Sequence, residues 1–211
     1  METTKVTFKI QSGLMNYLNA QLNECHMKRD SFLHHVVRTE LPYLSAELEG
    51  YRTSQKAKQF ISNKIRRMEL TTVNVVFPKT TADELRDVVE KHNLVRDAFI
   101  NRLVLFLLSP GEFLERIEVP AVLNHSSMRD LGSLPTSPLG AIKKTLLDPL
   151  YFIRNYLEDE DLDPIYRVIL AGPVQAFSCY WPDELVPGTT AEKKSKQELD
   201  KIIGSLFKDG D

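Results

Sequence analysis

The chain carries one short pattern twice, as Val6-Thr7-Phe8-Lys9-Ile10 near the start and as Val73-Asn74-Val75-Val76-Phe77 further on. Each stretch is followed by a helical pattern, which ends in Arg29-Asp30-Ser31-Phe32-Leu33 in the first copy and in Arg96-Asp97-Ala98-Phe99-Ile100 in the second. An offset of 67 residues relates the two copies without a gap, and it also pairs Leu18 with Leu85, Leu22 with Val89, Val36 with Leu103 and Leu41 with Leu108. A register kept over about forty residues indicates one structural unit used twice.

Each unit is predicted to be a short strand followed by two helices. Strand side chains alternate between two faces with a period of two residues, so the apolar positions should share the inner face. That face contains Val6, Phe8, Ile10, Val73, Val75 and Phe77, whereas the outer face contains Lys5, Thr7, Lys9, Thr72, Asn74 and Val76.

Local signals place the ends of these elements in the second unit. Pro78 should end the strand because proline lacks the backbone donor, and Thr80-Thr81 offers a helix N-cap with Glu84 three residues after Thr81. His92-Asn93 should separate the two helices, since Asn tolerates a left-handed turn.

A two-stranded ribbon is marginal in water without further packing. We therefore expect the strand at 5–10 to pair antiparallel with the strand at 72–77 of the same chain, which brings Thr7 close to Asn74. The helices of the two units should interlock over the inner face. The predicted fold class is mostly α, with one two-stranded antiparallel ribbon.

The start of the second helix in each unit resembles a known motif. His26-Met27-Lys28-Arg29-Asp30-Ser31-Phe32-Leu33 and Asn93-Leu94-Val95-Arg96-Asp97-Ala98-Phe99-Ile100 align with the Gly-x-Ser-Arg-Ser-Glu-x-Ile that often opens this helix in the ribbon-helix-helix superfamily of the methionine and Arc repressors. The Arg and the apolar pair agree, whereas His26 and Asn93 replace the Gly, and Lys28 and Val95 replace the capping Ser.

The resemblance covers roughly residues 4–44 and 71–108. It implies an intrachain pseudo-dimer that reads double-stranded DNA with its ribbon in the major groove. Two such units in one chain also look like the plasmid-transfer accessory proteins of the TraY type.

The outer face of the predicted ribbon contains no acidic residue, which favours DNA binding over an inert ribbon. Lys5 and Lys9 can donate to guanine, Asn74 can make paired bonds to adenine, and Val76 can contact a thymine methyl group. Phosphate contacts are expected from Lys28, Arg29 and Arg96 at the helix starts and from Arg66 and Arg67. The alternative is a small α+β core with no role in nucleic-acid binding.

Charge differs between the two halves of this chain of 211 residues, whose net charge is −2. Residues 1–109 contain 16 Lys and Arg against 12 Asp and Glu, whereas residues 110–211 contain 11 against 17. The positive half is therefore the half that contains the repeats.

The chain has no run of eighteen apolar residues and begins with a polar stretch, so we expect a cytoplasmic protein without membrane contact. Its two cysteines, Cys25 and Cys179, suit a reducing compartment and buried thiols.

The expected organisation is a first unit at 1–44, a helical basic connector at 45–70, a second unit at 71–110 and a helical C-terminal domain at 111–211. Pro42 should end or kink the last helix of the first unit. In the C-terminal domain, apolar helical segments are expected at 139–157 and 164–170, separated by an acidic turn at 158–163. A final helix is expected at 191–207, and this domain is the candidate for self-association or for contact with a protein partner.

No motif for catalysis, for a cofactor or for a metal site is present, so the prediction is a protein that is not an enzyme. Cys25-His26 and His34-His35 are assigned to helix turns and solvent-exposed faces, and the corresponding residues of the second unit are His92-Asn93 and Asn101-Arg102. Three functions remain open: a DNA-binding transcriptional regulator, in particular a repressor; an antitoxin that represses its own operon and binds a toxin through the C-terminal domain; and a relaxosome-type accessory protein for plasmid DNA.

Overall fold

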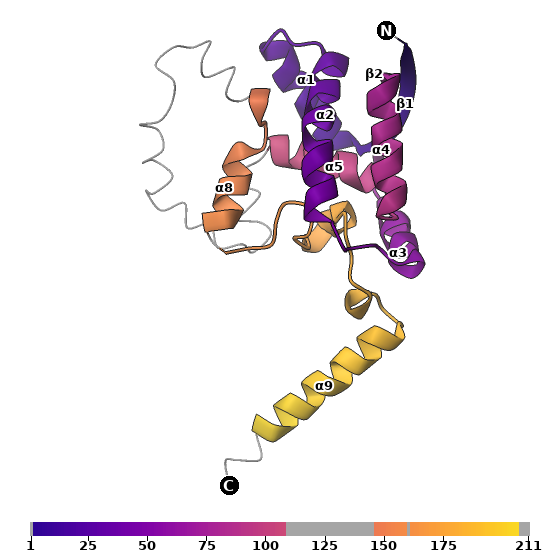
Figure 1. Cartoon of the computed structure of the whole chain (residues 1–211), viewed down its shortest axis with the longest axis vertical. Helices are drawn as coiled ribbons and strands as arrows, with labels where there is room; N and C mark the ends of the chain where they lie inside the picture. The colour runs from indigo at the N-terminus through magenta and orange to yellow at the C-terminus, as the bar shows by residue number, and fades with distance from the viewer. Residues whose placement is uncertain (1, 109–145, 160, 207–211) are drawn as a thin grey trace.

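The computed structural model describes residues 2–108, 146–159 and 161–206, without the side chains of 152, 156, 159 and 199–206. The described part is mostly helical and contains one two-stranded antiparallel sheet (Figure 1). The N-terminal half has the predicted order of elements: β1 (Thr3–Gln11), α1 (Ser12–Glu24), α2 (Arg29–Glu47), α3 (Gln55–Ile65), β2 (Leu70–Pro78), α4 (Lys79–Lys91) and α5 (Arg96–Leu108). No described helix is both long enough and apolar enough to cross a membrane.

The sheet consists of β1 and β2, which run antiparallel with Thr7 opposite Asn74. This confirms the predicted pairing, although each strand is longer than its predicted range. Val6, Phe8 and Ile10 of β1 are buried together with Val73, Val75 and Phe77 of β2, and the side chains between them are exposed. The alternation in the sequence thus gives the correct inner and outer faces.

The two strand-helix-helix units interlock. The second helix of each unit lies against the strand of the other unit: α2 contacts β2 and α4, while α5 contacts β1 and α1. The two ends of the ribbon close in the same way, because Ser12 N donates to Glu69 O and Lys79 N donates to Glu2 O, each at 3.0 Å. The offset of 67 residues therefore holds for hydrogen bonds as well as for sequence.

The connector, which was predicted to be helical, contains the helix α3. Its N-terminus is capped by Ser54, whose hydroxyl accepts from Ala57 N at 3.1 Å. The helix buries Ala57, Ile61 and Ile65, and its half-buried Phe60 packs on Trp181 with the ring centroids 5.5 Å apart.

The predicted start of the first helix of the second unit is wrong, and the second helix of the first unit does not end at Pro42, which was one of the two outcomes expected there. Helix α2 continues past Pro42 to Glu47, because its last turn buries Leu44 against the core. Helix α4 begins at Lys79 rather than after Thr81, with Pro78 at the N-cap position and no side-chain cap. The Thr81 side chain is buried and forms a hydrogen bond with His34 at 3.2 Å.

The C-terminal elements that the structure describes are α8 (Tyr151–Asp159), two 3-10 helices, η2 (Gly172–Phe177) and η3 (Asp183–Leu185), and α9 (Thr190–Leu206). Helix α9 extends away from the rest of the chain (Figure 1). The expected elements within 111–145 lie outside the described residues. Of the acidic stretch at 158–163, Glu158, Asp161 and Asp163 are exposed, and Asp163 pairs with Arg167 at 3.2 Å.

Residues 165–168 form a turn and a bend, so the helix predicted at 164–170 is wrong. The physical reason is Arg102, a fully buried side chain of α5 that donates to the carbonyls of Ile165, Val168 and Phe177. A helix over 164–170 would use the Ile165 carbonyl for its own backbone, because Ile169 N would donate to it. Arg102 and its neighbour Asn101 are both buried, so the positions that correspond to His34-His35 in the second unit do not lie on a solvent-exposed face.

The pseudo-equivalent of Arg102 in the first unit is His35, 67 residues earlier, and it also holds the C-terminal part: its Nε2 donates to the carbonyl of Leu146. The thiol of Cys179 is buried as expected, whereas that of Cys25 is exposed. The buried apolar side chains of residues 150–186 and of the two units form one continuous core.

A buried polar cluster also joins α2 to the C-terminal part. Arg154 of α8 donates to Glu40, to Glu47 at 3.0 Å and to Asp148 at 3.3 Å. The Tyr166 hydroxyl donates to Glu40 at 2.6 Å, and Tyr166 N donates to Glu47 at 2.8 Å. Glu40 is 0% exposed, and burial outweighs the nearby Arg154 and raises the pKa of the Glu40 carboxyl above its ordinary value of 4.5.

This shift predicts how stability depends on pH. A raised pKa means that the folded chain holds the Glu40 proton more tightly than the unfolded chain does, so this stabilising contribution is present at low pH and is lost as pH rises through the folded-state pKa. Wild-type protein should therefore gain stability relative to Glu40→Gln as the pH falls toward the ordinary carboxyl pKa of 4.5. Urea unfolding of both proteins at several pH values checks this. A relative loss of wild-type stability on acidification would contradict it.

Candidate nucleic-acid interface

The outward face of the sheet, here called the ribbon face, consists of Lys5, Thr7 and Lys9 from β1 and Thr72, Asn74 and Val76 from β2. All six side chains are exposed, and none is acidic. Across the strands, Lys5 lies opposite Val76, and Lys9 lies opposite Thr72. Val76 is apolar and yet 41% exposed. The ribbon face thus combines hydrogen-bond donors with one apolar contact point.

Two arginines hold the edges of the ribbon. Arg29, at the start of α2, donates from its guanidinium to the Asn74 carbonyl at 3.2 Å, and Arg96, at the start of α5, donates to the Thr7 carbonyl at 2.6 Å. The same offset relates the two contacts, because Arg96 lies 67 residues after Arg29 and Asn74 lies 67 residues after Thr7. Both arginines were predicted to contact phosphates. In the structure, at least one guanidinium N–H of each arginine donates to a backbone carbonyl of the ribbon.

The residue after each arginine completes the contact. Asp30 accepts a hydrogen bond from Val76 N, and Asp97 accepts one from Lys9 N, each at 3.2 Å. Exposed strand edges are the usual sites of unwanted strand addition. Because Arg-Asp pairs cover the outer edges at these positions, the ribbon face is the part of the sheet that remains open.

The helix starts are placed by matching turns. His26 and Asn93 have positive φ angles of 55° and 53°, in the left-handed region that favours glycine. Both residues thus take a backbone conformation that side chains other than Gly rarely adopt. The next residues close the turns, with Met27 N donating to Leu22 O at 2.8 Å and Leu94 N donating to Val89 O at 2.9 Å.

The two units differ beside one end of the ribbon. Asn101 donates to Lys9 O and accepts from Gln11 N, both at 2.8 Å, so it continues the coverage of the β1 edge. The corresponding residue 67 positions earlier is His34, and the strand position corresponding to Gln11 is Pro78, which has no N–H to donate. Sequence reasoning missed Asn101, although the exchange of Gln11 for Pro78 was a usable signal.

The remaining phosphate-contact candidates are exposed. Lys28 immediately precedes α2, and Arg66 and Arg67 follow α3 a few residues before β2. Within the described part of the chain, the side chains of Arg66 and Arg67 make no hydrogen bond or ion pair. By contrast, Lys58 of the same basic stretch donates to Asn93 Oδ1 at 3.0 Å, and Lys64 donates to Gln175.

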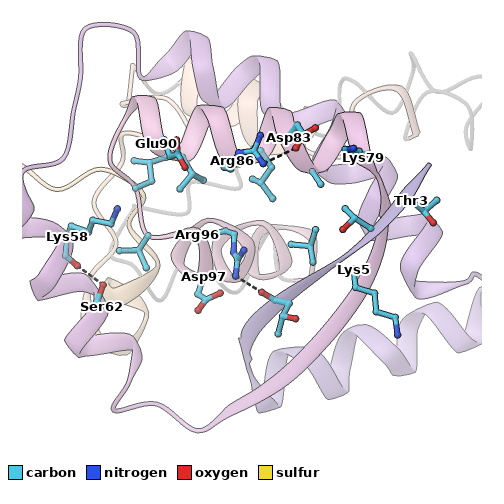
Figure 2. Close-up of a pocket in the computed structure, with 18 of the residues that line it drawn as sticks. Thr3, Lys5, Lys58, Ser62, Lys79, Asp83, Arg86, Glu90, Arg96 and Asp97 are labelled. Atoms are coloured by element: carbon cyan, nitrogen blue, oxygen red, sulfur yellow. Dashed lines mark hydrogen bonds and ion pairs between the residues drawn. The ribbon is translucent and has the colours of Figure 1, made fainter. Parts of the chain in front are cut away.

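A cleft of about 860 Å³ lies beside the β1 edge, between α4, α3 and the start of α5 (Figure 2). Its charges have both signs, and several are paired within the protein: Arg86 with Asp83 at 2.9 Å and Lys79 with Glu2 at 3.1 Å. The lining as a whole has five basic side chains (Lys5, Lys58, Lys79, Arg86 and Arg96) against four acidic ones (Glu2, Asp83, Glu90 and Asp97), so its charge is nearly balanced. The ribbon face therefore remains the stronger candidate for contact with a nucleic acid.

Within the described ranges, no three His, Cys, Asp or Glu side chains are grouped so that they could hold a metal ion. Comparison of the chain with protein-family models, with curated proteins and with solved structures gave no match.

Proposed function

We propose that this protein binds double-stranded DNA sequence-specifically as a transcriptional regulator, acting as a repressor. In this proposal the two strand-helix-helix units are ribbon-helix-helix units that form a pseudo-dimer within one chain. The observation that carries the proposal is the ribbon face, which is exposed and free of acidic residues while the edges beside it are covered by Arg-Asp pairs.

The shape of the ribbon supports this function. The major groove of B-DNA is wide enough to admit a two-stranded ribbon, and its floor presents the base edges. The outward side chains of such a ribbon would then meet the bases directly. Lys5 and Lys9 supply donors, and Val76 supplies an apolar contact that suits a thymine methyl group.

The surrounding positive charge supports binding to the DNA backbone. Phosphate contacts fix the register of a protein on DNA, and each contact releases condensed counterions. Arg66 and Arg67 are suited to this role because they are exposed and form no hydrogen bond or ion pair with the described part of the chain. The net charge of +4 over residues 1–109 acts in the same direction.

DNA affinity should fall steeply with salt concentration. Because each phosphate contact contributes about one unit to the slope of log K against log salt, replacing Arg66 and Arg67 together with Gln should reduce the slope by about two. Fluorescence anisotropy measures this slope between about 50 and 200 mM salt, with a duplex selected by the protein from a random pool.

The matched control is Lys193→Gln with Lys194→Gln, which removes the same charge from the exposed start of α9, far from the ribbon. This control should leave the slope unchanged. A flat slope for the wild-type protein, or failure to select any duplex, would contradict the proposed function.

A further inference from the structure

We propose that Thr7 sets the base preference of Asn74, so that the centre of the ribbon favours guanine rather than the adenine that a free asparagine favours. The proposal rests on the DNA-binding function above and concerns the same face. Its basis is the hydrogen bond that Thr7 Oγ1 donates to Asn74 Oδ1 at 2.8 Å.

The backbone geometry accounts for this contact. The carbonyls of Thr7 and Asn74 point outward to Arg96 and Arg29, so these two residues form a pair without mutual backbone hydrogen bonds. Side chains lie closest across antiparallel strands in such pairs. Because an arginine holds each backbone from outside, the two side chains are kept together in the middle of the ribbon face.

The hydrogen bond changes what Asn74 offers to a base. An asparagine reads adenine with a pair of bonds, in which its amide oxygen accepts from N6 and its amide nitrogen donates to N7. In this structure the Thr7 hydroxyl takes one of the two acceptor sites of Oδ1 and holds that oxygen turned toward β1. The Asn74 amide nitrogen keeps both of its donors, which match the two adjacent acceptors of guanine, O6 and N7.

The neighbouring residues reinforce this preference. Lys5 and Lys9 flank Thr7 on the same face of β1, and an ammonium group can only donate. The centre of the ribbon face therefore presents donors on both strands, and runs of acceptors occur in the major groove where guanines follow one another. Thr7 acts here as a positioning residue, which need not itself contact a base.

The test compares three proteins in parallel selections from a random duplex pool: wild type, Thr7→Val and Thr7→Ser. Valine keeps the shape of threonine but lacks the hydroxyl, and serine keeps the hydroxyl. Asn74→Ala first identifies the base pair under Asn74 as the position whose preference disappears. Affinities for duplexes that differ only at that base pair then give the preference of each protein.

Wild type and Thr7→Ser should prefer guanine over adenine at that position by about tenfold, the scale of one paired base contact, and Thr7→Val should shift the preference to adenine. A merely structural role of Thr7 would lower affinity for all duplexes alike. An adenine preference in the wild type, or an unchanged preference in Thr7→Val, would overturn this inference and leave DNA binding intact. Absence of any selected duplex would instead overturn the proposed function.

Discussion

Phe8→Ala should lower the free energy of unfolding by about 3–5 kcal/mol, the usual result of removing a large aromatic side chain from a core. Phe8 is 0% exposed and packs against Phe77 with their ring centroids 6.0 Å apart. The Arg96 guanidinium also lies over the Phe8 ring, 5.3 Å from its centroid. The substitution therefore leaves a cavity under the ribbon and removes a support of the arginine that covers the β1 edge.

Urea unfolding followed by circular dichroism measures this change. The matched control is Tyr17→Ala, which truncates an aromatic side chain that is exposed on α1, and it should change stability by no more than about 0.5 kcal/mol. Equal stability of Phe8→Ala and the wild type would show that the inner face of the sheet is not packed as described.

Arg154→Met should destabilise the chain by about 3–5 kcal/mol, the range for removing one partner of a buried ion pair. Arg154 is the cation that contacts Glu40, Glu47 and Asp148. Its loss leaves the fully buried Glu40 without a positively charged partner, although Tyr166 still donates to it. A second substitution, Glu40→Gln, should recover part of the loss because it removes the uncompensated charge.

The control for this experiment is Arg86→Met on α4. Arg86 also pairs with carboxylates, Asp83 and Asp87, but its side chain is 59% exposed, and exposed pairs contribute only about 0–1 kcal/mol. If Arg154→Met costs no more than Arg86→Met, the polar cluster does not hold the C-terminal part to α2. A double-substitution cycle with Glu40 then measures their coupling directly.

The sequence predicted those features of the fold that depend on local periodicity. Alternation in Val6-Thr7-Phe8-Lys9-Ile10 identified the inner and outer faces, and the repeat identified the partner strand and the register. The roles of Arg29 and Arg96 were not predictable in this way, because each contacts a carbonyl that lies far away in the chain.

The wrong helix prediction in the C-terminal part has the same origin, a contact between residues that lie far apart in the chain. Residues 164–170 contain apolar side chains at helical spacing, but Arg102 binds two carbonyls in this segment and the local pattern is overridden. Only the fold shows that α5 buries this arginine. The ribbon face was predicted residue by residue because exposure in a strand follows directly from its period, whereas the link between Thr7 and Asn74 needed the register of both strands.

The difference between Asn101 and His34 illustrates a consequence of having both units in one polypeptide. In an assembly of two identical chains, any inherited change beside the ribbon would occur on both sides at once, so each side would be constrained by the needs of the other. In this single chain, a change in one codon alters one side of the ribbon alone. The two halves of the surface can therefore drift apart through single inherited changes, and dilution cannot separate them.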